Sequence, residues 1–464
     1  MVELLKRQEE EEKLKEKTRA ISIKEAGIFS VSDGFGLRNI SPYALALGAG
    51  NTAIGLLSSL PSLIGNFSQL FTSRLMRKYS RKKIVVVSVF LQAFMWLILL
   101  IPGLLFFIFH FSSKVSSSSL VVIYTLLVLF GAIAGPAWQS WMKDISPQRS
   151  GHFFGVRNKV AGTVSLVSML VAGFILDYFK QTKIFMAFVI LFSFSFVARS
   201  ISGYLFTKEY DPEFKYEPAS YFSFVQFLKK MTGNNFGRFV IFISLISFAT
   251  AIASPFFVVY MIKDRGMSYS AYFATTIANT LVTLLVMPFW GKFADSHGNV
   301  KIMKILGFFI CLTPMLWVFS IFFDGFILLL YLVLIEAFAG FVWAGFNLAA
   351  GNFIYDAVTR QRMAICTSYF NILNGFGVFL GASLGGILAS FNLHFLAYGM
   401  IFVFFISGLA RLAIYLIFAR RIHEVREVES FDGVKHIKKK LSIFNPLRFL
   451  EYFSSRELKS VGVD

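Results

Sequence analysis

The chain has little charge, few cysteines and no catalytic constellation. Only 15% of its 464 residues are charged while 56% are hydrophobic, so a water-soluble domain could not cover its apolar surface. Its 2 cysteines, Cys311 and Cys366, lie in apolar runs without metal-ligand spacing, which predicts packing roles. The 6 histidines are scattered, and a Gly-x-x-x-x-Gly-Lys-Ser/Thr phosphate loop is missing. We therefore expect an integral membrane protein, with no enzymatic activity, no metal and no cofactor.

Long apolar runs fill most of the sequence. A helix needs about 20 apolar residues to cross the bilayer core. Between polar breaks we place twelve such runs, at 25–46, 52–73, 84–110, 119–141, 159–177, 184–206, 239–262, 270–293, 301–323, 326–350, 364–389 and 395–418. The predicted fold is an all-α integral membrane protein with twelve transmembrane helices.

Similar segments recur 212 or 213 positions apart. SPYALAL returns as SPFFVVY, with Pro42 matching Pro255, and ARSISGYLF returns as ARLAIYLIF, with Arg199 matching Arg411. Two copies of one half-sized unit in a membrane chain are typical of transporters. The sequence thus predicts two six-helix bundles, 25–206 and 239–418, each with a proline hinge in its first helix.

The net charge of +19 is explained by where the basic residues lie. The loop after the second run carries Arg74, Arg77, Lys78, Arg81, Lys82 and Lys83, whereas the alternate loops hold only Lys114, Lys180, Lys183, Lys263 and Arg265. This positive-inside asymmetry predicts a plasma-membrane protein with both termini in the cytoplasm, and no nucleic-acid partner.

Three polar segments complete the predicted organisation. Residues 1–24 form a charged cytoplasmic helix in place of a signal peptide, and residues 207–238 form a cytoplasmic linker between the bundles. Residues 419–464 form a basic cytoplasmic tail with interleaved aromatics, which either lies against anionic lipid or is simply solvated.

A loop motif at the end of the eighth run carries a family resemblance. The segment GKFADSHGNVKIMK resembles the cytoplasmic loop signature of the major facilitator superfamily, and it matches at Gly291, Ala294, Asp295, Gly298 and Lys301. The equivalent first copy, SRLMRKYSRKK, has Arg77 at the aspartate position and serines at both glycine positions. In the family this aspartate helps to latch neighbouring helices, so the N-terminal half needs a different latch. Two further loops resemble the family in pairing an acid with a base, Asp144 with Arg149 and Asp356 with Arg362.

Polar stripes at helical spacing mark candidate solute-binding residues, because a helix facing lipid cannot keep them. The clearest stripe contains Glu336, Gly340, Trp343 and Asn347. Asn279 lies on a second stripe, Asn39 on a third with Asp33 and Arg38 beside it, and Trp138 and Gln139 near the end of the fourth run. The resemblance implies that helices 1, 4, 7 and 10 line the central cavity.

Each candidate has an alternative role. Carboxylates in hydrocarbon cost a few kcal/mol, so Asp33 and Glu336 either serve solute binding or proton transfer, or form structural hydrogen bonds. Arg38 either anchors an anionic solute or pairs with Asp33, and the polar stripes either bind solute or pack helices. Trp138 and Gln139 lie near the end of the fourth run, where they are either interfacial or line the cavity. Arg199 and Arg411 lie at matching places near the ends of the sixth and twelfth runs, and we expect both to snorkel to the membrane surface.

The resemblance implies a monomeric secondary active transporter of a small solute, with alternating access between its halves and with protons as a potential coupling ion. If protons are coupled, Glu336 or Asp33 titrates during the cycle. The alternatives are a transporter of lipids or amphiphiles and a non-transporting receptor or scaffold on the same fold. They are distinguished by whether Asp33, Arg38 and Glu336 face a wet central cavity.

Overall fold

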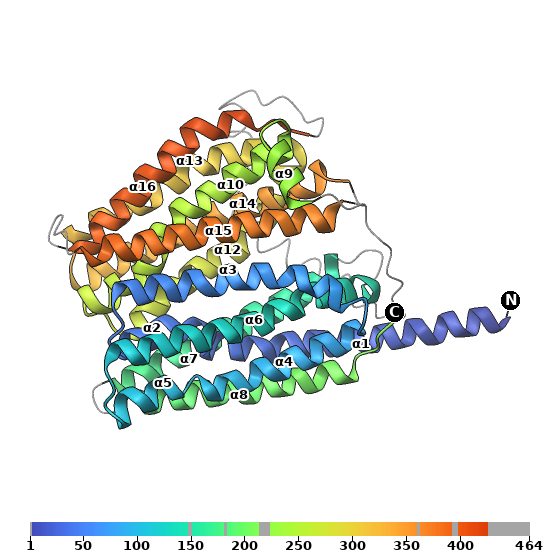
Figure 1. Cartoon of the computed structure of the whole chain (residues 1–464), viewed down its shortest axis with the longest axis horizontal. Helices are drawn as coiled ribbons and strands as arrows, with labels where there is room; N and C mark the ends of the chain where they lie inside the picture. Colours follow the sequence, from blue (N-terminus) through green and yellow to red (C-terminus); the bar gives the residue numbers. More distant parts are fainter. Residues whose placement is uncertain are drawn as a thin grey trace, which may run out of the picture.

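The computed structural model describes residues 2–146, 151–180, 183–212, 223–359, 362–391 and 398–425. These residues form helices and no strand, and the helices make two bundles that lie side by side (Figure 1). Arg149 and the tail beyond residue 425 lie outside the described residues.

The N-terminal bundle begins with α1, which continues without a break from the charged segment into the first predicted span. Its first part projects beyond the bundle (Figure 1). α1 packs against α7 and α8, α4 packs against α6 and α8, and α3 packs against α6. The bundle comprises α1 (Val2–Phe35), α2 (Ile40–Ala46), α3 (Asn51–Leu75), α4 (Arg81–Ile98), α5 (Ile101–Gly103), α6 (Ser113–Ile145), α7 (Gly151–Phe179) and α8 (Ile184–Lys208).

The C-terminal bundle repeats this arrangement after the short linker helix α9 (Phe224–Lys230). α12 packs against α14, α10 packs against α15 and α16, and α13 packs against α14 and α16. The bundle comprises α10 (Asn235–Ala253), α11 (Phe257–Val259), α12 (Tyr269–His297), α13 (Asn299–Val318), α14 (Gly325–Ala357), α15 (Met363–Ser390) and α16 (Gly399–Phe418).

Ten helical stretches in the described residues are long and apolar enough to cross a membrane, and they correspond to the third to twelfth predicted spans. The first two predicted spans fall on α1–α2 and α3, which pack in the same bundle without meeting that measure. α1 carries Glu25 and Asp33, Arg38 lies in the break that follows, and α3 is rich in serine. The fold is thus an all-α membrane protein, and the count of twelve spans remains a prediction.

Both proline motifs lie where a helix is interrupted. A 3-10 turn at Leu37–Asn39 separates α1 from α2, which contains Pro42, and a 3-10 turn at Ser254–Phe256 contains Pro255 between α10 and α11. Because proline lacks a backbone donor, it is tolerated at such breaks. The breaks occur at equivalent places in the two halves.

Glycines let α15 approach α10 closely. A Cβ atom at Gly377, Gly381 or Gly385 would lie 2.3, 2.0 or 2.1 Å from a carbonyl oxygen of α10. Side chains at these positions would therefore separate the two helices. The four-residue spacing of these glycines in the sequence predicts this packing.

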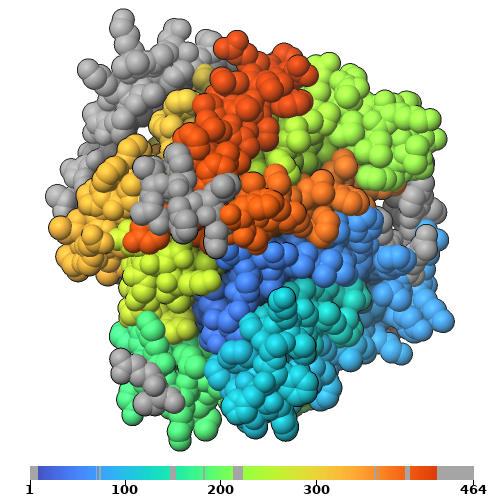
Figure 2. Space-filling model, turned by 60° about the vertical axis from the view of Figure 1, so that its left-hand side comes forward, coloured from blue at the N-terminus to red at the C-terminus, as the bar shows by residue number. Residues whose placement is uncertain are grey.

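The halves meet along α3 with α15 and along α7 with α12 (Figure 2). We call the end of the molecule that carries the α3–α4 turn the basic end, and the other end the opposite end. At the opposite end, Asn51 Nδ2 donates to the carbonyl oxygen of Ala389 at 2.7 Å. There the carboxylate of Asp177 on α7 also accepts the backbone N–H groups of Tyr269 and Ser270, at 2.7 and 2.8 Å. The halves are thus hydrogen-bonded where α12 begins.

Candidate functional site

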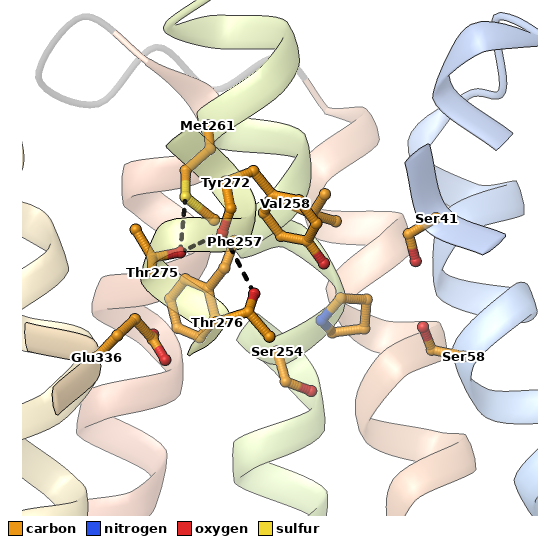
Figure 3. A pocket seen from close by; sticks show the side chains of 11 residues that line it. Ser41, Ser58, Ser254, Phe257, Val258, Met261, Tyr272, Thr275, Thr276 and Glu336 are labelled. Carbon is orange, nitrogen blue, oxygen red and sulfur yellow. Dashed lines mark hydrogen bonds between the residues drawn. The ribbon is translucent and has the colours of Figure 1, made fainter. Parts of the chain in front are cut away.

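Two adjoining cavities lie between the helix breaks and the neighbouring helices. The first, of about 270 Å³, is lined from both halves, and Glu336 on α14 reaches it on one side while Ser41 and Ser58 lie on the other (Figure 3). The second, of about 250 Å³, shares Ser41 and Ser58 with the first and is lined by the N-terminal half. Tyr124 contributes to the second and Tyr272 to the first.

Glu336 is held in place by a neighbouring helix. Asn279 Nδ2 on α12 donates to Glu336 Oε2 at 2.9 Å. One turn along α14, a Cβ atom at Gly340 would lie 2.3 Å from the carbonyl oxygen of Asn279, so only glycine permits this approach of α12 and α14. Thr283 Oγ1 then donates to the Gly340 carbonyl at 3.1 Å. The two polar stripes predicted from the sequence therefore meet each other.

Asp33, near the end of α1, forms an ion pair with Arg38 in the 3-10 turn that follows. Arg38 Nε lies 3.5 Å from Asp33 Oδ2, and Ser165 Oγ on α7 donates to the same oxygen at 2.9 Å. Arg38 is within electrostatic range of Tyr124 and Tyr272, which come from different halves. The pair therefore lies beside the central cavities. The side chain of Arg38 is 46% exposed and that of Asp33 is 22% exposed.

The remaining candidates occupy three kinds of position. Asn39 is buried, and its amide donates to the carbonyl oxygens of Gly34 and Phe35 at 2.9 and 3.0 Å, which satisfies the end of α1. Trp138 stacks under the guanidinium of Arg157 at 4.5 Å.

Trp343 is half-buried and makes an edge-on contact with Phe346. Gln139 on α6 and Asn347 on α14 are exposed toward the basic end.

The C-terminal loop signature forms the connection from α12 to α13. Ala294 is fully buried, and Gly298 has a φ of +86°, which favours glycine. A Cβ atom at Gly298 would also collide with Glu424, whose carboxylate accepts the backbone N–H of Val300 at 2.8 Å. Gly291 faces open space. Asp295 and Lys301 lie on α12 and α13 beside this connection.

The two halves latch their basic ends differently. Asn299 Nδ2 donates to Asp356 Oδ2 at 2.7 Å in the C-terminal half. At the equivalent place in the N-terminal half, the buried Arg81 donates to Asp144 Oδ2 at 2.5 Å and to the carbonyl of Pro212 at 3.1 Å. Among the described residues the base that contacts Asp144 is Arg81, and Arg362 is exposed at the start of α15.

A buried charge network, absent from the sequence prediction, lies near the basic end of the N-terminal half. Glu25 on α1 is 2% exposed and lies 3.1 Å from Arg157 and 3.7 Å from Arg199. Ser202 Oγ donates to Glu25 at 2.7 Å, and Arg199 Nε donates to Gln92 at 2.7 Å. The available signal was the place of Glu25 at the start of the first predicted span, on the same helical face as Ser32.

The snorkelling expected of Arg199 and Arg411 is wrong. They are 7% and 2% exposed, and both point into their bundles. Arg411 Nη1 donates to the carbonyl of Ile310 at 3.1 Å and to Thr313 Oγ1 at 3.0 Å. A position near a helix end allows a side chain to reach water, but packing with α13 and α4 decides whether it does.

Metal-ligating side chains do not cluster in the part of the chain that the structure describes. Within the described ranges, no three His, Cys, Asp or Glu side chains are placed to hold a metal ion. Cys311 and Cys366 are buried and free, as their place in apolar runs predicts.

The fold and site define a multi-pass helical membrane protein with two like halves around central cavities. The family model of the Major Facilitator Superfamily matches residues 26–354 and 239–456. The chain therefore belongs to the Major Facilitator Superfamily, a family of membrane transporters.

Individual relatives agree with this family. An uncharacterized MFS-type transporter of Methanocaldococcus jannaschii is 26% identical over 271 residues, and this match spans 58% of the chain and 65% of the relative, just under two thirds of its length. Similar solved structures share the fold at low identity.

Three of these structures cover nearly the whole chain. The first is a bacterial homologue of the human lysosomal transporter Spinster, inward-facing and unoccupied, with a TM-score of 0.64 and 13% identity over 90% of this chain and 99% of that one. The second is the nucleoside transporter NupG, with a TM-score of 0.62 and 14% identity over 88% of this chain and 98% of that one. The third is an inward-facing bacterial homologue of the iron transporter ferroportin, with a TM-score of 0.68 and 11% identity over 87% of this chain and 98% of that one.

Proposed function

We propose that the protein is a secondary active transporter that moves a small polar solute by rocking its two halves about the central cavities. The observation that carries this proposal is a cavity of about 270 Å³ lined from both halves, with Glu336 among several hydroxyl groups in its wall. A site shared by two rigid halves changes its access when they rock. Family membership supports the same function.

The contacts between the halves favour access from the basic end in this state. The opposite end is joined by the hydrogen bonds of Asn51 and Asp177, whereas the polar side chains of Gln139 and Asn347 are exposed nearer the basic end. The positive-inside asymmetry supports an orientation with the basic end and both termini in the cytoplasm of a plasma-membrane protein. We take the transporter to be a monomer that opens inward here.

Glu336 is the candidate for proton coupling. Its carboxylate lines a cavity that both halves form, so the side from which solvent reaches it changes when the halves rock. A carboxylate that alternates between solvent access on two sides can carry a proton between them.

Transport assays in proteoliposomes test this function. We would load vesicles with sugars, amino acids, organic anions, nucleosides or amines, and measure exchange and pH-driven accumulation of each. Glu336→Gln should abolish accumulation against a gradient while exchange persists at saturating solute, because glutamine keeps the Asn279 contact without titrating. Undiminished uphill transport in that variant would refute the proton role, and no flux of any solute through folded protein would refute the transporter.

A further inference from the structure

We propose that the solute is a small organic amine with one positive charge, and that Glu336 binds its ammonium group. This inference rests on the proposed transport function and specifies the solute. It follows from the charges beside the cavities, which are those of Asp33, Arg38 and Glu336. Glu336 lines the first cavity, and Asp33 and Arg38 lie eight and three residues before Ser41, which lines both.

The charges of Asp33 and Arg38 balance each other. Asp33 Oδ2 accepts from Arg38 at 3.5 Å and from Ser165 at 2.9 Å. An arginine already facing a carboxylate offers an anionic solute little net attraction. The N-terminal wall of the site is therefore close to neutral, and Arg38 has its counter-ion in the neighbouring turn of α1.

The charge of Glu336 is not balanced by a base. Its hydrogen bond from Asn279 comes from a neutral amide, and no ion pair in the described part of the chain includes it. Neutral donors orient a carboxylate without cancelling its charge. An ammonium group entering the cavity would supply the missing counter-ion.

The rest of the cavity wall suits an ammonium group. Phe257 and Tyr272 line the same cavity as Glu336, and a cation is attracted to an aromatic face within about 6 Å of its centre (Figure 3). Ser254 and Thr276 supply hydroxyl oxygens. An ammonium group has only donors, so it needs acceptors of this kind. A carboxylate-bearing solute would instead meet the repulsion of Glu336.

Size and charge limit the amine. The two adjoining cavities hold about 270 and 250 Å³, at the small end for ligand pockets. Glu336 supplies one negative charge and the N-terminal wall is close to neutral, so a second positive charge on the solute would lack a counter-ion. A single ammonium group on a short, partly apolar skeleton fits both conditions.

A ligand set with matched shapes tests the proposal. We would measure thermal shifts of the full purified chain with small monoamines, each accompanied by the alcohol and the carboxylate of the same skeleton, for example 2-phenylethylamine, 2-phenylethanol and 3-phenylpropionate. A bound ligand raises the melting temperature by mass action. We expect amines alone to do so, and Glu336→Gln to weaken their binding about 10- to 100-fold, as for a lost hydrogen bond to a charged group.

Three variants serve as controls. Glu336→Asp should restore part of the binding, because it restores the charge, and Glu10→Gln, which removes an exposed acid far from the cavity, should bind as the parent does. Asp33→Asn should weaken amines and strengthen carboxylates, because it leaves Arg38 without its counter-ion.

The outcomes separate the solute from the function. Equal binding of amines and alcohols, or amine binding that survives Glu336→Gln, would overturn the assigned contact. Transport of neutral or anionic solutes with no amine bound would overturn the amine proposal and leave the transporter standing. Failure of every solute to move through folded protein would remove the transport function itself.

Discussion

The two halves place an arginine at the same point of α8 and α16 and surround it differently. Arg199 has Glu25 at 3.7 Å, with Gln92 and Ser202 as further partners. Arg411, equally buried, has a hydroxyl and a backbone carbonyl. Offset by the repeat, the position of Glu25 corresponds to Arg238 at the start of α10. Both copies have the cation, and at this position the acid occurs in the N-terminal copy alone.

This difference separates the effect of a buried arginine's position from the effect of a neighbouring acid. A guanidinium can span two or three helices through its several donors, whether or not an acid is present. An acid adds a strong pair, but each partner then depends on the other, since a buried charge left alone is costly. We therefore expect the N-terminal half to respond far more strongly to single substitutions than the C-terminal half.

Glu25→Leu should have the largest effect. It leaves Arg157 and Arg199 beside an apolar side chain, and breaking a buried ion pair in this way costs about 3–5 kcal/mol. Unfolding of the purified protein in mixed micelles measures the change. Glu25→Gln, which retains the Ser202 contact, should lose less. A loss below about 1 kcal/mol for Glu25→Leu would show that the network contributes little.

Glu209 should make the stability of the N-terminal half depend on pH. It follows α8, and its carboxylate is buried without a hydrogen-bond partner among the described residues. Burial raises its pKa from about 4.5 to about 9; Glu25 also raises the pKa, and Arg157 and Lys82 lower it. The folded state therefore holds a proton that the unfolded chain releases.

Because the pKa of Glu209 is raised in the folded state, a rising pH lowers the free energy of unfolding. The contribution of Glu209 to stability is fully present below about pH 4.5 and is lost as the pH rises through about 9. The slope is at most about 1.4 kcal/mol per pH unit for one proton. Micelle unfolding between pH 5 and 9 should show it, and Glu209→Gln should flatten it. An identical slope in the variant would assign the pH dependence to other groups.

Arg411→Met should have the smallest effect. It removes a desolvated charge and leaves no acid behind, so we expect a change within about 1 kcal/mol of zero, in either direction. Arg199→Met is the matched control and should cost more, because it withdraws one of the two bases of Glu25. If the two methionine variants lose equal stability, the acid does not distinguish the halves.

Much of the architecture was predictable because it depends on local composition and periodicity. Apolar runs gave ten of the spans, the glycine spacing on α15 indicated close packing, and polar stripes indicated that Asn279 and Glu336 face inward. The contacts of Arg81 with Asp144 and of Glu25 with Arg199 were not predictable, because they join segments far apart in the chain. The direction of an arginine near a helix end likewise depends on the neighbouring helix.

The carboxylate of Asp177 makes closure of the opposite end a reversible event of low energy. It accepts two backbone N–H groups at the start of α12, but Ser268 caps the same helix from within the C-terminal half through the N–H of Ala271 at 3.1 Å. When the halves part, α12 keeps its own cap and water takes the place of Asp177. Such an exchange with water changes the free energy by about 1 kcal/mol per bond. The closed and open arrangements can then lie close in energy, as repeated cycling at ambient temperature requires.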